Sequence, residues 1–102
     1  MADRFLSLLG LCRRASKLNL GCDPVIDSVN KNKAHLVMFA ADCADNTKTK
    51  VEKALIGFKV SIFTLDYTKE EISLALGKNV AVLSVCDKGF KDAFVKLILK
   101  ED

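Results

Sequence analysis

The chain has 102 residues, half of which are hydrophobic and 28% of which are charged. This length suits one compact domain over residues 1–102, and it excludes an enzyme built from several domains. The net charge of +3 arises within residues 1–35, where six basic residues oppose three acidic ones. Such an uneven distribution indicates either a polyanionic partner or a solvated face that keeps a small protein in solution.

The first predicted element is an amphipathic helix within residues 3–16. Its apolar residues recur at the spacing of one helical face: Phe5, Leu8, Leu9 and Cys12. Arg13 and Arg14 close this helix, where positive charges suit the negative end of the helix dipole. A short extended segment at residues 18–20 follows and ends at Gly21.

A second helix is predicted to begin after Asp23, because Asp is a good N-cap and Pro24 suits the first helical position. Its apolar face is short, so we expect this helix to end near Asn32. A third helix is expected to have Asn46 as its N-cap and to end close to Gly57.

Three further segments have the length and apolar character of strands: residues 36–41, 60–65 and 80–85. Strands of this kind are covered on both faces. Thr68 and Glu71 predict the capping box of a fourth helix, Gly77 predicts its end, and helical spacing returns at residues 90–98. The alternation predicts the α/β class: a three-layer α/β/α sandwich around a central mixed sheet of about four strands, including residues 18–20.

The cysteines and the single histidine give little sign of a metal or cofactor. Cys12, Cys22, Cys43 and Cys86 form no C-x-x-C pair, and His35 has no neighbouring ligand in the sequence. We expect four free thiols and no metal or cofactor, with a disulfide as the open alternative. No apolar run is long enough to span a membrane and no secretory signal is visible, so we expect a cytoplasmic protein without membrane contact.

Cys43 is the one candidate for a catalytic nucleophile. It follows an apolar strand and precedes a helix, whose N-terminus could lower the pKa of the thiol. A phosphatase-like loop would have Arg six residues later, where this chain has Thr49, and only His35 could act as a base. We therefore predict no catalytic residue, and a thiol-dependent enzyme is the least favoured hypothesis.

Nucleic-acid binding asks less of the sequence: cations for phosphates, free amides at a helix start, and a backbone that can be approached closely. Three predicted turns offer these features, and we expect them to line one edge of the sheet. The candidate RNA-binding residues are Arg13, Arg14, Lys17, Gly21, Cys22, Asp23, Lys33, Asn46, Lys48, Lys78 and Asn79. No aromatic stacking motif is present, so the expected target is folded RNA rather than a single strand.

The order and spacing of several segments carry a family resemblance across almost the whole chain. These segments are LLGLCRRASKLNLG at residues 8–21, the run from Gly21 to Val37, Ala41-Asp42, Asn46-Thr47-Lys48, residues 68–71 and Leu76-Gly77-Lys78. Together they resemble the ribosomal protein L7Ae/L30e family, and within it the small bacterial YlxQ-like branch. The resemblance implies the α/β/α fold and binding to a kink-turn, a bent internal loop of RNA with sheared G·A pairs.

The resemblance also implies which residues contact RNA. In the family they lie in a G-x-N-E-x-x-K motif and in the turn before the last strand. Gly21 matches the Gly of this motif, whereas Asp23 stands at the Asn position, Pro24 at the Glu position and Asp27 at the Lys position. Asp27 replaces a cation by an anion, which implies a weaker affinity and a smaller salt dependence. Asp23 either accepts a hydrogen bond from a base edge or caps the helix.

The sequence therefore predicts a non-catalytic, ribosome-associated protein that recognises a kink-turn or a similarly bent RNA. Its expected partners are ribosomal or other kink-turn-containing RNA and the ribosome, and it is expected to be a monomer. The alternative is a protein-interaction or assembly module that keeps the fold with weakened RNA contacts.

Overall fold

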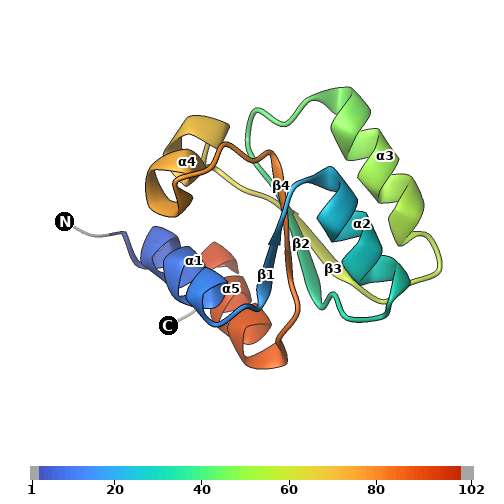
Figure 1. Ribbon diagram of the computed structural model, residues 1–102, viewed down its shortest axis with the longest axis horizontal. Coiled ribbons are helices and arrows are strands. Elements are labelled where there is room, and N and C mark those ends of the chain that lie inside the picture. The colour runs from blue at the N-terminus through green and yellow to red at the C-terminus, as the bar shows by residue number, and fades with distance from the viewer. Residues whose placement is uncertain (1–2, 100–102) are drawn as a thin grey trace.

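The computed structural model describes residues 3–99, which alternate between helices and strands along the chain (Figure 1). The elements are α1 (Arg4–Arg14), β1 (Leu18–Leu20), α2 (Cys22–Asn30), β2 (Leu36–Phe39), α3 (Asp45–Leu55), β3 (Ser61–Thr64), α4 (Lys69–Leu76), β4 (Val82–Val85) and α5 (Lys88–Leu99). β1 matches its predicted segment, and each of the other three strands is two residues shorter than the apolar segment predicted for it.

The four strands form one mixed sheet in the order β1-β4-β2-β3. β2 and β3 are parallel, whereas β4 is antiparallel to both of its neighbours, β1 and β2. The two central strands, β2 and β4, are buried along their whole length, which explains their continuous apolar sequence. Residues 18–20 form the edge strand β1, as predicted.

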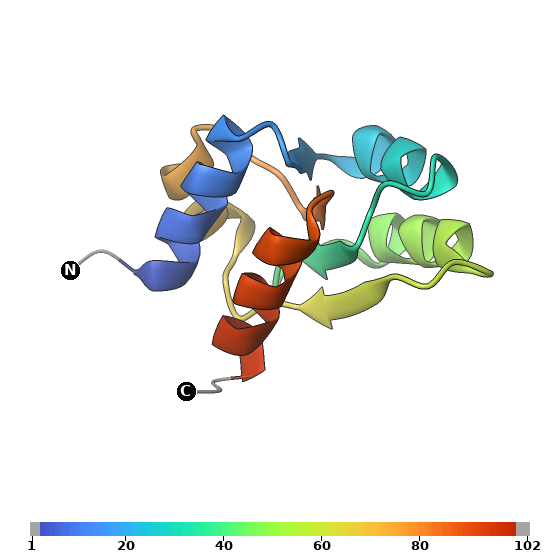
Figure 2. The same ribbon diagram turned by 90° about the horizontal axis from the view of Figure 1, so that it is seen from below.

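The helices cover both faces of this sheet, with α2 and α3 on one side and α1, α4 and α5 on the other (Figure 2). One apolar core lies under α1, α4 and α5 and contains the buried side chains of Leu9, Ile72 and Phe94. The second lies under α2 and α3 and contains those of Val29 and Val51. The predicted three-layer α/β/α sandwich is confirmed.

Side chains cap the starts of α1, α4 and α5; at α5 the Asp87 carboxylate accepts a hydrogen bond from the Phe90 amide over 2.9 Å. The Asp3 carboxylate accepts hydrogen bonds from the amides of Phe5 and Leu6 at the start of α1. Thr68 and Glu71 form the predicted capping box of α4, and each bonds to the backbone amide of the other.

Two predicted caps are wrong. The N-cap of α2 is Gly21, not Asp23, and the N-cap of α3 is Ala44, not Asn46. Gly21 has a φ of 98°, so the chain turns directly from β1 into the helix and Asp23 falls within the first helical turn. An acidic side chain still suits that turn, because the helix dipole is positive there.

Candidate nucleic-acid interface

One edge of the sheet gathers three of the turns that the sequence singled out. β1, β2 and β3 end at this edge and β4 begins there. The Gly21 amide donates to the Val82 carbonyl over 3.0 Å, and the Ala40 amide donates to the Ala81 carbonyl over 2.8 Å. We call this surface the Gly21 edge: the start of α2 (residues 21–23), the segment leading into α3 (residues 40–46) and the turn before β4 (residues 77–81).

The start of α2 leaves backbone amides open at the Gly21 edge. No side chain among residues 3–99 caps this helix end, and Pro24 has no N–H to offer. The amides of Cys22 and Asp23 are therefore the donors that an anion could meet here. The positive φ at position 21 would strain a residue with a side chain, and glycine adopts it freely. Because glycine has no side chain, a ligand can also come close to the backbone at this corner.

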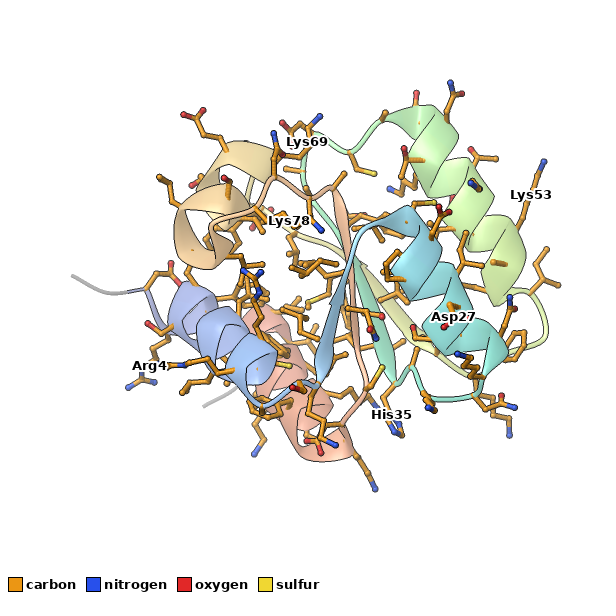
Figure 3. The ribbon with its side chains drawn as sticks, in the orientation of Figure 1. Arg4, Asp27, His35, Lys53, Lys69 and Lys78 are labelled. Atoms are coloured by element: carbon orange, nitrogen blue, oxygen red, sulfur yellow. The ribbon has the colours of Figure 1, made fainter. Side chains whose placement is uncertain are left out.

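Lysines from the later part of the chain supply positive charge at this edge. Lys50 lies on α3, with its ammonium 3.6 Å from the Asp23 carboxylate. Lys48 donates to the Thr64 hydroxyl over 3.0 Å, and its ammonium lies over the Phe39 ring. Figure 3 shows Lys69 and Lys78 on the same side of the molecule, between α4 and the start of α2.

Carboxylates balance much of this charge. Besides Asp23, the edge carries Asp42, which accepts a hydrogen bond from the Lys69 amide over 2.8 Å, and Asp45 in the first turn of α3. The surface is therefore a mixture of both signs rather than a strongly basic patch. A polyanion would be held there by a few directed contacts more than by a broad field.

Asn46, Asn79 and Cys22 are also at the Gly21 edge, as predicted from the sequence. Asn46 is the second residue of α3 and is exposed, and Asn79 is exposed in the turn before β4. Cys22 is half-buried at the first position of α2. Amide side chains at such positions can donate and accept hydrogen bonds at a base edge.

Two of the candidate RNA-binding residues, Lys17 and Lys33, do not lie at the Gly21 edge. Lys17 precedes β1 while Gly21 follows it, and the Lys17 carbonyl accepts from the Cys86 amide at the far end of β4. Lys33 follows α2, whose start and not its end faces the Gly21 edge. Both residues lie toward the opposite edge of the sheet, which His35 marks in Figure 3.

Arg13 and Arg14 face α4 rather than Gly21. The Arg13 guanidinium donates to the Leu76 carbonyl at the end of α4, directly before Gly77 and Lys78. Arg14 lines an open groove between α1 and α4. The arginines therefore border the turn before β4, and the first third of the chain contributes less charge to the Gly21 edge than predicted.

Lys50 lies one turn beyond Asn46 on α3, at the same corner. Sequence reasoning missed Lys69 as a candidate. Lys69 is the first residue of α4, and its position after the third strand was the available signal.

The thiols show no sign of activation. All four cysteines are free, as predicted. Burial raises the pKa of Cys12 to about 12, and burial also raises the pKa of Cys43 despite the nearby Lys48. A raised pKa keeps Cys43 protonated, which is the opposite of what a nucleophile needs. Within residues 3–99, no group of His, Cys, Asp and Glu is arranged to hold a metal, and no helix is long and apolar enough to cross a membrane.

Three curated relatives cover most of the chain. The RNA-binding protein YlxQ of Enterococcus faecium is 34% identical over 96 residues, which span 94% of this chain and 92% of that protein. YlxQ of Bacillus subtilis (strain 168) is 32% identical over 96 residues, spanning 89% and 91%. The large ribosomal subunit protein eL30 of Euphorbia esula is 30% identical over 88 residues, spanning 84% and 79%.

Two solved structures share the fold. A protein of unknown function from Bacillus halodurans C has a TM-score of 0.85 and 28% identity, with 95% of this chain and 98% of that chain covered. The 15.5kD RNA binding protein of Giardia lamblia has a TM-score of 0.70 at 20% identity, covering 98% and 89%, and this similarity shows the fold alone.

The relatives are RNA-binding and ribosomal proteins by name, which confirms the prediction that the chain is not an enzyme. The family itself is shown by residues 3–95, which match a family model over nearly the whole length. The chain belongs to the Ribosomal protein L7Ae/L30e/S12e/Gadd45 family.

Proposed function

We propose that this chain binds folded RNA through the Gly21 edge and that it prefers a sharp bend of the kink-turn type. One observation carries the proposal. The two segments that the resemblance assigns to RNA contact, the start of α2 and the turn before β4, meet at one edge through the bond between Gly21 and Val82. The YlxQ relatives, named as RNA-binding proteins, support the choice of partner.

Each part of the edge has a role in this proposal. The amides of Cys22 and Asp23 donate to a phosphate at the positive end of the α2 dipole. Lys78 and Lys48 neutralise phosphates on the two sides of the bend. Asn79 offers an amide that can read the edge of an unpaired base.

A bend suits this surface better than a straight duplex does. The edge is formed by turns from three parts of the chain, so its contacts point to one small region rather than along a groove. RNA recognition of this kind depends on shape and on exposed base edges, which a duplex hides in its deep, narrow major groove. The proposal includes association with ribosomal RNA, action as a monomer, and a cytoplasmic site where free thiols persist.

A titration with two RNAs tests the proposal. A labelled kink-turn hairpin and a hairpin with a fully paired stem of the same length are titrated with the protein at two salt concentrations. We expect tighter binding to the kink-turn, with log Kobs falling by about 0.7 to 0.9 per unit of log salt for each phosphate neutralised. Equal affinity for both hairpins would overturn the preference for a bend.

A matched pair of lysine variants tests the surface. Lys78→Ala removes a cation from the Gly21 edge, whereas Lys53→Ala removes one from the last turn of α3, away from that edge (Figure 3). We expect Lys78→Ala to weaken binding and to reduce the salt slope by about 1. Lys53→Ala should leave both quantities unchanged, and an equal loss in the two variants would place the RNA elsewhere.

A further inference from the structure

An open groove of about 940 Å³ lies between α1 and α4, on the other helical layer from α2 and α3. Its walls are mainly apolar, and two of its leucines are unusually exposed: Leu11 at 50% and Leu74 at 84%. Leu6, Ala75 and Leu76 continue the apolar surface between them. Large apolar side chains gathered at one surface are typical of a binding site rather than of scattered exposure.

The two helices that form the groove run in the same direction. Tyr67, just before α4, donates to the Asp3 carboxylate at the start of α1, and Arg13 at the end of α1 donates to the Leu76 carbonyl at the end of α4. These two contacts join α1 and α4 at the two ends of the groove. The lining along α1 extends from its cap residue Asp3 to Arg14, a rise of eleven residues, which at about 1.5 Å per residue gives a length of about 16 Å.

Gly10 is the second observation that points to a ligand. It lies within α1 and lines the groove, and within residues 3–99 a Cβ at this position would meet nothing within 4 Å beyond its chain neighbours and the adjacent backbone of α1 itself. Glycine inside a helix costs about 0.5 to 1 kcal/mol relative to alanine, so its presence needs a compensating reason. Packing within the described chain offers none, because the space above Gly10 is open. A glycine here gives a bound molecule closer access to the backbone of α1.

We propose that the groove binds one amphipathic helix of a partner protein, which carries leucine-like side chains along one face and carboxylates at one end. The apolar walls take the leucines. The exposed Arg14 lies at the end of the groove and selects the carboxylates. A groove of about 16 Å holds roughly three turns of such a helix.

Charge and shape favour this occupant over the other candidates. None of the described residues that line the groove is aromatic, so a base would have no ring to stack on. The exposed leucines therefore favour an apolar protein segment over RNA. A second copy of this chain would need about 800 Å² and roughly 20 to 30 residues per partner in a stable dimer, whereas ten residues line the groove. The groove adjoins the Gly21 edge only where Leu76 precedes the turn before β4, and the proposal does not depend on RNA binding because its test measures binding of a peptide.

Gly10→Met tests the groove without removing any contact that holds the fold. The added side chain enters open space and replaces glycine by a better helix former, so the circular dichroism spectrum should be unchanged. The probe is a synthetic helical peptide of about 12 residues with leucines on one face and glutamates at one end. A matched peptide carries lysines in place of the glutamates.

We expect the acidic peptide to bind the wild-type protein and to shift amide resonances of α1 and α4 in a heteronuclear NMR titration. Gly10→Met should weaken this binding by about tenfold or more, and the lysine peptide should bind several-fold more weakly than the acidic one. Affinity for the kink-turn hairpin should be the same in Gly10→Met and the wild type. Loss of RNA affinity in Gly10→Met would make the groove an RNA surface and would overturn the proposal.

Two other outcomes also decide against it. Equal peptide binding by the wild type and Gly10→Met would place the peptide outside the groove. Resonance shifts of α1 and α4 that follow protein concentration, without peptide, would show that a second copy covers the groove. A failure of the kink-turn titration leaves the peptide-binding and resonance-shift measurements intact, so the two proposals fail separately.

Discussion

At the scale of single residues, Asp3 and Tyr67 form the most consequential polar pair outside the Gly21 edge. The Tyr67 hydroxyl donates to the Asp3 carboxylate over 2.7 Å, and the Tyr67 ring stacks on Phe5 with centroids 5.1 Å apart. Burial, and then the hydrogen bond to Asp3, raise the pKa of Tyr67 to about 12. The hydrogen bond from Tyr67 in turn lowers the pKa of Asp3. The pair thus links the start of α1 to the segment that precedes α4.

Because Tyr67 is the only tyrosine, its ionisation can be followed directly by ultraviolet absorbance. We expect a midpoint near 12 in the folded protein, compared with about 10 in the unfolded chain. Asp3→Asn should lower the midpoint only in part, since burial remains. The pKa of Tyr67 is higher in the folded protein than in the unfolded chain. Its contribution to the free energy of unfolding is therefore complete below pH 10 and is lost as the pH rises toward 12. A midpoint near 10 in the folded protein would contradict the prediction.

At the scale of elements, helix starts differ in how well the sequence predicts them. The capping box of α4 could be recognised because Thr68 and Glu71 bond to each other's backbone amides, only three positions apart. The start of α2 could not, because it depends on the bond from Gly21 to Val82, which is 61 positions away in the chain. A cap formed by two nearby side chains can be predicted from their spacing in the sequence. A helix start that is fixed by a hydrogen bond to a distant strand can be predicted only when the order of the strands in the sheet is known.

The sequence also did not predict a network of hydrogen bonds between side chains in the interior. It joins β1, β4 and α2: the Asn19 amide donates to the Ser84 hydroxyl over 3.2 Å, the two hydroxyls of Ser84 and Ser28 are 2.8 Å apart, and Ser28 donates to the Val25 carbonyl. Ser84 is fully buried within an otherwise apolar strand. The residues that bond to Ser84 lie far from it in the sequence, so its hydrogen-bond partners can be identified only from the packing of β1, β4 and α2.

We expect Ser84→Ala to lower the free energy of unfolding by about 1 to 3 kcal/mol, because it leaves Asn19 and Ser28 short of a buried partner. The double variant Ser28→Ala with Ser84→Ala should cost less than the sum of the two single variants, since removing both hydroxyls leaves fewer unpaired groups. Urea denaturation of the four proteins gives the coupling energy. Strictly additive effects would mean that the two hydroxyls contribute independently.

At the scale of the whole molecule, the common edge of the three turns was easier to predict than which basic residues lie there. Gly21, Asn46, Lys78 and Asn79 follow or precede strands, and the order of those strands brings them to one edge. Lys17 is only four positions from Gly21, yet three strand residues between them separate the two by about 13 Å. Residues that are close in sequence can therefore lie at opposite edges of the sheet when a strand separates them. The direction of each strand decides which turns share an edge.

Variants of Asp27 test whether bound RNA reaches the exposed face of α2. It lies one turn beyond Asp23, points outward in Figure 3 and pairs with Lys31 over 3.0 Å, so part of its charge is already offset. Asp27→Lys should raise the affinity for a kink-turn hairpin several-fold and steepen the salt slope by about 1, because a cation then faces phosphate. Asp27→Asn removes the repulsion without adding a contact, so it should give a smaller gain with little change in slope. If neither variant alters affinity or slope, RNA does not reach the middle of α2 and its footprint is confined to the turns of the Gly21 edge.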